Sequence, residues 1–230
     1  NQKDFVRAII VVETPPPARE APHGGTALDL SLGSEQIANS LNATLLERLG
    51  KSKLRTFLAT EGRIVFPDHT NPLVSVIMPT YNRAYYTFLA LESLLASERA
   101  IPFELVIIDN ASHDETRSLL SRLESVRVHM NEVNKGFGAA CNLGARMARG
   151  EYLCFLNSDT LLIPGWLAPL VKTMQDYPNC GAVGAKLIHP DGDLQEAGCI
   201  IWQDGSAHAY GRGDDPLAPE YCYVREVDYC

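Results

Sequence analysis

Short apolar runs alternate with amphipathic segments along the chain from about residue 73 onward. The runs are rich in β-branched residues and stop at proline, glycine, asparagine or aspartate, which is typical of buried strands. The predicted strands are residues 73–78, 104–108, 126–130, 152–156 and 182–188. The predicted helices between them are residues 85–97, 138–149 and 167–177, and Ser112 and Glu115 match a capping box for one more. This alternation predicts an α/β fold, a mostly parallel sheet flanked by helices.

Residues 1–72 have a different pattern and are predicted to form an N-terminal extension of a domain at residues 73–230. Residues 6–12 form one predicted strand, and a proline- and glycine-rich linker follows at residues 14–25. An apolar stripe predicts a helix over residues 34–49 that Gly50 ends, and a second helix over residues 51–60. We expect the stripe to pack on the neighbouring domain or on a partner.

Beyond residue 188 the pattern favours hairpins. Asp191-Gly192 and Asp204-Gly205 are tight-turn signals on either side of an apolar run, residues 197–202. Residues 211–216 predict an exposed loop, and residues 221–227 one more strand. The chain stops at Cys230 in the middle of this pattern, so we expect it to be a fragment of a longer protein.

Composition narrows the class of protein. A hydrophobic content of 46% in 230 residues is enough for a real core, and a net charge of −8 argues against a nucleic-acid-binding surface. No apolar run approaches the roughly 20 residues that a membrane-spanning helix needs. The 6 cysteines contain no C-x-x-C pair and fit a reducing, cytoplasmic protein. Cys180, His189, Cys199 and His208 match no common zinc spacing.

Polar residues gather where three of the predicted strands end. They are residues 79–83, 109–112 and 157–159. Because parallel strands present their carboxyl ends at one edge of the sheet, where α/β proteins bind ligands, we expect these residues to form one site. Taken alone, residues 157–159 fit a turn and helix cap equally well, with Pro164 opening the next helix.

Four segments of the chain, taken in their order along the sequence, resemble motifs of the inverting glycosyltransferases of family 2, which have the GT-A fold. The resemblance is closest to the bacterial rhamnosyltransferase-like members. The matching residues are 74–83, 106–112, 134–142 and 155–159, and the resemblance covers roughly residues 73–230. It implies transfer of a sugar, with inversion, from a UDP- or dTDP-linked donor to a glycan or lipid-linked glycan. It also implies a cytoplasmic location, either free in the cytoplasm or peripheral at the inner face of the membrane.

The resemblance also implies roles for individual residues. Asp109 would accept hydrogen bonds from the nucleotide base, and Asp159 would bind Mg²⁺ or Mn²⁺ at the donor diphosphate. Asn157 stands where the family's D-x-D motif begins with aspartate, so the identity of the metal stays open. The other expected substrate-binding residues are Pro79, Thr80, Tyr81, Asn82, Arg83, Asn110, Asn134, Lys135, Gly136, Phe137, Asn142, Asn157 and Ser158.

The general base is expected beyond Cys230, because the family carries it in the acceptor-binding half. We interpret Asp214, Asp215 and Asp228 as solvated loop charges, and expect the chain to bind donor but transfer little sugar. One alternative is a non-catalytic nucleotide-sugar or glycan-binding module of a larger assembly. A sugar nucleotidyltransferase would need a triphosphate-binding loop rich in glycine and basic residues near the first strand. Residues 79–83 do not provide such a loop.

Overall fold

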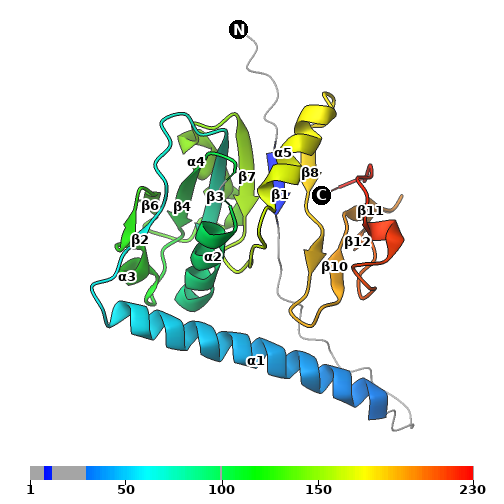
Figure 1. Ribbon diagram of the computed structural model, residues 1–230, viewed down its shortest axis with the longest axis horizontal. Helices are drawn as coiled ribbons and strands as arrows, with labels where there is room; N and C mark the ends of the chain where they lie inside the picture. The colour runs from blue at the N-terminus through cyan, green and yellow to red at the C-terminus, as the bar shows by residue number, and fades with distance from the viewer. Residues whose placement is uncertain (1–7, 12–29, 99, 230) are drawn as a thin grey trace.

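A six-stranded, wholly parallel sheet forms the centre of the computed structural model, with the order β6-β4-β3-β7-β1-β8 (Figure 1). The structure describes residues 8–11, 30–98 and 100–229, and only the backbone of residues 8–11 and 30–43. The strands are β1 (Ala8–Val11), β3 (Val74–Thr80), β4 (Phe103–Asp109), β6 (Arg127–Met130), β7 (Tyr152–Leu156) and β8 (Ala182–Gly184). The predicted α/β fold, a mostly parallel sheet flanked by helices, is confirmed.

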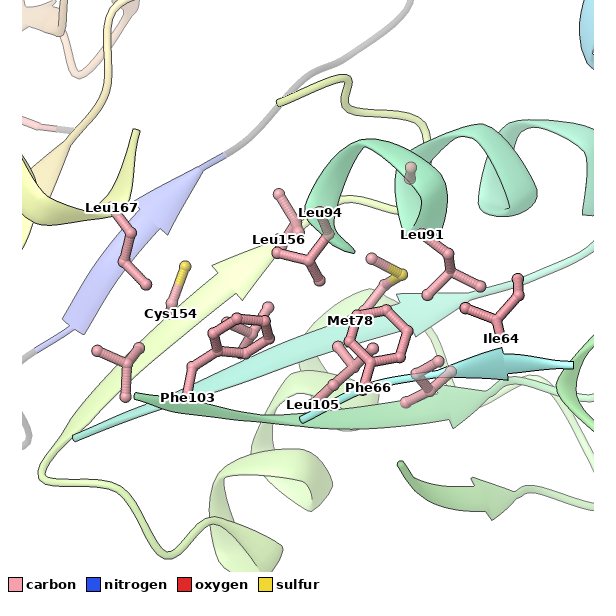
Figure 2. Packing of buried hydrophobic residues seen from close by; sticks show 14 of the residues in the cluster. Ile64, Phe66, Met78, Leu91, Leu94, Phe103, Leu105, Cys154, Leu156 and Leu167 are labelled. Carbon is pink, nitrogen blue, oxygen red and sulfur yellow. The ribbon is translucent and has the colours of Figure 1, made fainter. Parts of the chain in front are cut away.

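Helices cover both faces of this sheet. On one face, α2 (Ala84–Ser97) and α5 (Leu167–Asp176) pack with the strands in the larger apolar cluster, which includes Met78 and Leu156 (Figure 2). On the other face, α4 (Phe137–Met147) packs against a smaller cluster around Ile77. Because both faces are covered, every residue of β3 and of β4 is buried, as a continuous apolar run predicts.

The strand order reverses between β3 and β7. From β3 the chain runs outward to β4 and β6, and then returns to the other side of β3 as β7. Such a switch point separates the loops that leave the two neighbouring strands, and it opens a place for a ligand at their carboxyl ends. A ligand is therefore expected to bind between the loops that follow β3 and β7.

The N-terminal part contributes one strand to the sheet and one long helix. β1 pairs with β7 on one side and β8 on the other, which places it inside the sheet. The predicted boundary at residue 72 stays a prediction, and the predicted linker at residues 14–25 lies outside the described residues. A single helix, α1 (Leu30–Leu58), replaces the two that were predicted.

Gly50 does not end a helix, and that prediction was wrong. It is buried inside α1, where an added Cβ would stand 2.9 Å from Cδ1 of Leu89 in α2. The glycine thus allows the two helices to approach closely. At the end of α1, Arg122 donates hydrogen bonds to the carbonyls of Phe57, Leu58 and Thr60. Its positive charge at the carboxyl end of the helix also interacts favourably with the helix dipole.

Smaller elements complete the fold. They are β2 (Ile64–Val65), β5 (Leu123–Glu124), β9 (Leu187–Ile188), β10 (Leu194–Glu196), β11 (Cys199–Ile201), β12 (Ala207–Ala209) and a 3₁₀ turn, η1 (Pro219–Tyr221). The predicted turns are confirmed, since β9–β10 and β11–β12 are antiparallel pairs. The single strand predicted at residues 182–188 is two short strands. No helix in the described part of the chain is long and apolar enough to cross a membrane.

The strand predicted at residues 221–227 was wrong. Tyr221 ends the 3₁₀ turn and is buried, and its hydroxyl donates a hydrogen bond of 2.5 Å to Asp214. This contact holds the segment against the preceding loop instead of along a strand. Farther on, an isolated bridge pairs Tyr229 with Cys199.

Candidate functional site

The carboxyl ends of β3, β4 and β7 lie at one edge of the sheet, as expected for parallel neighbours. Thr80 and Asp109, the last residues of β3 and β4, are paired in register. β3 also pairs with β7, so the turns that carry Arg83 and Asp159 leave neighbouring parallel strands. The structure therefore brings together the three polar segments that the sequence singled out.

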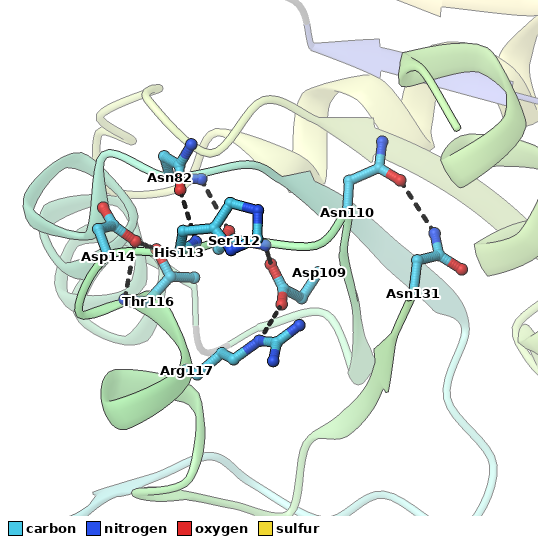
Figure 3. A network of polar contacts seen from close by, with 9 residues as sticks. All are labelled: Asn82, Asp109, Asn110, Ser112, His113, Asp114, Thr116, Arg117 and Asn131. Carbon is cyan, nitrogen blue, oxygen red and sulfur yellow. Dashed lines mark hydrogen bonds and ion pairs between the residues drawn. The ribbon is translucent and has the colours of Figure 1, made fainter. Parts of the chain in front are cut away.

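The turn between β3 and α2 has an uncommon backbone conformation. Asn82 and Arg83 are left-handed, with φ angles of 55° and 54°. The turn is held by the loop after β4, because the Asn82 amide donates to Ser112 Oγ (2.7 Å) and the His113 amide donates to Asn82 Oδ1 (2.8 Å) (Figure 3). The side chain of Asn82, predicted to bind substrate, is thus engaged in fixing one loop on the other.

Asp114 ties two helices to this pair of loops. Its Oδ2 accepts the amide of Ala84 at the start of α2, and its Oδ1 accepts the amide of Thr116 at the start of α3 (Thr116–Leu120). Burial disfavours the ionised carboxylate, but hydrogen bonds from the Thr116 side chain and from both amides outweigh it and lower the pKa of Asp114. The predicted capping box was wrong, since Ser112 bonds to Asn82 instead.

Asp109 is fully buried, with 0% exposure. Its Oδ1 accepts the amide of Ser112 (3.1 Å), and its Oδ2 lies 3.4 Å from Nε of the half-exposed Arg117 (Figure 3). Asp109 therefore organises the loop that leaves β4. A carboxylate has about four lone-pair directions, so these two contacts leave part of its acceptor capacity unused.

The other residues at the end of β3 differ in what they can offer a ligand. Pro79 is buried within the strand, and the Thr80 hydroxyl is paired with that of Thr87 at 3.0 Å. Tyr81 is 47% exposed, so its ring is open to solvent. Tyr81 is therefore better placed than Thr80 to contact a ligand directly.

The loop before α4 depends on one buried amide, that of Asn110. Asn110 Nδ2 donates to the carbonyl of Gly136 (3.1 Å), and Asn110 Oδ1 accepts the amide of Lys135 (3.1 Å). Within the loop, Asn134 Oδ1 accepts the amide of Gly136, whose φ of 81° suits glycine. The side chains of Asn134, Lys135, Phe137 and Asn142 are exposed around it.

The segment after β7 is a half-buried turn. Asn157, Ser158 and Asp159 are partly buried, and the Thr160 amide donates to the carbonyl of Asn157. Burial raises the pKa of Asp159, and the charge of Arg83 opposes that shift in part. Pro164 does not open the next helix as predicted, because α5 begins at Leu167, after a turn at Gly165.

Residues 75–219 match the family model described as Glycosyl transferase family 2. The chain belongs to this family. It is an inverting family, so the resemblance seen in the sequence is confirmed at the level of the family.

Individual relatives of this family 2 domain are longer proteins. The O-antigen biosynthesis protein RfbC of Myxococcus xanthus is 36% identical over 155 residues, which are 65% of this chain and 12% of RfbC. The uncharacterised protein y4gI of Sinorhizobium fredii is 34% identical over 63% of this chain, which spans 16% of y4gI. The Pyrobaculum calidifontis mannosyltransferase PcManGT, solved with GDP-Man and Mn²⁺, is 27% identical over 61% of this chain and 42% of PcManGT, with a TM-score of 0.41.

The residues at the family 2 site fit a divalent metal only if the phosphates of a bound donor supply further metal ligands. Among the described residues no three Asp, Glu, His or Cys side chains gather into a metal-binding cluster, and this holds for the four candidate zinc ligands too. Next to Asp159, the buried hydroxyl of Thr160 lacks a hydrogen-bond partner within the described chain. Mg²⁺ and Mn²⁺ prefer such oxygens and keep open positions for phosphates. Asp159, with Thr160 beside it, is thus a fitting but incomplete ligand set.

The sequence reasoning missed residues that build the site without facing it. Asp114, Arg117 and Asn131 each hold a predicted site residue or its neighbouring amide. None follows directly from a motif, because two of their partners lie 21 and 30 residues away in the sequence. A polar residue directly after a predicted strand, as Asn131 is, was the only available signal.

Proposed function

We propose that this family 2 domain binds a nucleotide-diphosphate sugar at the carboxyl edge of its sheet. The domain would transfer the sugar, with inversion, to a glycan or a lipid-linked glycan. The observation that carries the proposal is the convergence of residues 80–83, Asp109 and Asp159 at the carboxyl ends of the neighbouring strands β3, β4 and β7. The similarity to an O-antigen biosynthesis protein supports a role in polysaccharide synthesis. The bacterial, rhamnosyltransferase-like character and the UDP- or dTDP-linked donor are proposed from the sequence motifs alone.

Each part of the edge has its own task in this proposal. Asp109 accepts a hydrogen bond from the base, and Tyr81 lies against the base or ribose. The loop at residues 134–136 leads into α4, whose first amides and positive dipole end favour the diphosphate. Asp159 holds a divalent cation, which neutralises the charge that builds on the diphosphate as it leaves.

Inversion needs a general base on the sugar face opposite the leaving diphosphate. Three carboxylates near the end of the chain have other tasks in the structure. Asp214 accepts the Tyr221 hydroxyl, Asp215 accepts the amide of Leu217, and Asp228 accepts the amide of Ile201. All three are exposed, which agrees with their interpretation as solvated loop charges, and their hydrogen bonds hold neighbouring loop groups, so we assign none of them as the base.

A thermal-shift screen tests the proposal. The chain is mixed with UDP-, dTDP- and GDP-linked sugars, each with Mn²⁺, with Mg²⁺ or with EDTA. Because a ligand that binds only the folded state stabilises it, we expect a metal-dependent rise in Tm with UDP or dTDP sugars. No rise with any donor would contradict the proposal. Binding alone does not separate the enzyme from a non-catalytic module, because this chain is expected to bind donor and transfer little sugar in either case.

We also propose that this edge faces the cytoplasm. Asn110-Ala111-Ser112 matches the pattern for N-glycosylation, yet Asn110 is buried and its amide nitrogen donates to Gly136. A glycan on that nitrogen would break the loop at residues 134–136. Peptide mass spectrometry of material from the native source should find Asn110 unmodified, and a glycan there would contradict both the location and the site.

A further inference from the structure

Asn131 occupies a buried position directly after β6, with 3% of its surface exposed. Its backbone amide donates to the carbonyl of Asp109 at 2.8 Å, which continues the β6–β4 ladder. Its side-chain Nδ2 donates to Asn110 Oδ1 at 2.9 Å (Figure 3). Asn131 is therefore fixed by the sheet and aimed at the amide that holds the loop before α4.

This contact sets the direction of the Asn110 side chain. Asn110 Oδ1 receives two donors, Asn131 Nδ2 and the amide of Lys135, while Asn110 Nδ2 donates to the carbonyl of Gly136. An amide turned by 180° would point its NH₂ group at both donors and its oxygen at a carbonyl. Only one orientation satisfies all three partners, and Asn131 supplies one of the two donors that select it.

The loop has few other restraints. Residues 132–139 are exposed, so side-chain packing does not fix their conformation. Gly136 stands at the start of α4 with no side-chain cap, and its other hydrogen bonds are local: its amide donates to Asn134, and its carbonyl also accepts the amide of Ala140 in α4. The clasp made of Asn131 and Asn110 is thus the loop's link to the sheet.

Asn131 is not a favourable choice for stability alone. Its Oδ1 is buried and has no hydrogen-bond partner in the described part of the chain. A buried acceptor without a partner destabilises the folded state, and an apolar side chain of similar shape would avoid that cost. The asparagine is therefore best explained by the bond that it donates to Asn110.

We propose that Asn131 is a positioning residue for the nucleotide-sugar donor. It acts through Asn110 to hold residues 134–136 in the conformation that receives the donor, before the donor binds. This inference rests on the proposed function. A loop that is already ordered binds more tightly than one that must be ordered on binding.

The test combines Asn131→Ala with Asn131→Ser, which is less disruptive, and uses Val133→Ala in the same exposed loop as the matched control. Amide hydrogen exchange of Lys135 and Gly136 is measured without ligand, and the affinity for UDP and dTDP is measured with Mn²⁺. We expect faster exchange at both amides and about 5- to 10-fold weaker binding in the Asn131 variants, with neither change in the control. Combined with Asn110→Ala, either Asn131 variant should add little further loss.

Unchanged exchange at Lys135 in either folded Asn131 variant would overturn the inference. Faster exchange with unchanged affinity would overturn it too, while the proposed function stood. If the wild-type chain binds no nucleotide, the proposed function fails and the inference falls with it. The wild-type titration therefore separates the two failures.

Discussion

Asp109 is the residue where the fold and the proposed function meet. It is the last residue of β4, it is fully buried, and its two oxygens contact the Ser112 amide and Arg117. A buried carboxylate that already holds its own loop is rigid, so a further hydrogen bond to it needs little reorganisation. The same contacts mean that its removal affects stability as well as binding.

Asp109→Asn tests this residue with the least change of shape. We expect the affinity for the bare nucleotide to fall by about 1.5–3 kcal/mol, because a charge-assisted hydrogen bond is lost. Isothermal titration measures it, and urea unfolding in parallel separates a loss of fold. Arg117→Ala is the control, since it removes a partner of Asp109 but keeps the carboxylate. Equal affinity of the wild type and Asp109→Asn would remove Asp109 from the site.

At the residue scale, the sequence predicted which residues lie at the site but not what most of them do. Asp109 and Asp159 could be found because each follows an apolar run. Asn82 and Ser112 were also found, but they bond to each other's loops, and neither bond leaves a trace in a single sequence. Tertiary hydrogen bonds of this kind are set by how two strands lie side by side.

At the scale of elements, Glu104 joins four segments at the start of β4. It accepts hydrogen bonds from Ser75 Oγ (2.6 Å), Arg149 Nε (2.9 Å) and an Arg127 guanidinium nitrogen (3.1 Å). Burial opposes its ionisation, but the bonds from Ser75, Arg149 and Arg127 outweigh it and lower the pKa of the Glu104 carboxyl. Glu104 thus links β3, β4, β6 and the end of α4.

The lowered pKa predicts how stability changes with pH. A carboxyl with a depressed pKa in the folded state stabilises fully above its unfolded pKa, about 4.3, and the contribution is lost as the pH falls through the folded pKa. Glu104→Gln should therefore lower the free energy of unfolding by about 1–3 kcal/mol at pH 7. The difference from the wild type should shrink below about pH 4. A difference in urea unfolding that stays constant down to pH 3 would contradict this role.

The central strands and the helices α2, α4 and α5 were predicted from the sequence, whereas the single long helix α1 was predicted as two. The strands of the centre are buried on both faces, so their apolar runs are visible without knowledge of their neighbours. Gly50 signalled a helix end by its local preference, but contact with Leu89 in α2 explains it. Packing between helices overrides local propensity where the chain needs a close approach.

At the scale of the whole molecule, β1 connects the N-terminal part to the rest. It lies between β7 and β8 and forms hydrogen-bonded ladders with both. Without it, β8 would lose its partner in the sheet. The cohesion of the molecule on the side of α5 and β8 therefore depends on a strand that begins at Ala8.

Ile10→Pro tests this arrangement, because proline cannot donate a hydrogen bond to a ladder and is disfavoured in a strand that is paired on both sides. Ile10 is in register with Phe155 of β7 and Gly184 of β8. We expect a loss of about 3 kcal/mol or more in the free energy of unfolding, measured by urea unfolding. Ile10→Val, which keeps the donor and the β-branched shape, should change it by less than about 1.5 kcal/mol. Equal stability of Ile10→Pro and the wild type would contradict the six-stranded sheet.

The central claim is that Asp159 and its neighbours bind the diphosphate of a nucleotide sugar through a divalent cation. The most direct measurement is calorimetric titration of UDP and dTDP into the wild type and Asp159→Asn, each with Mn²⁺ and with EDTA. Asp176→Asn is the control, since Asp176 is an exposed carboxylate that pairs with Lys172 on α5. The account predicts that Mn²⁺ strengthens binding in the wild type and in Asp176→Asn but not in Asp159→Asn. Equal strengthening by Mn²⁺ in all three proteins would contradict it.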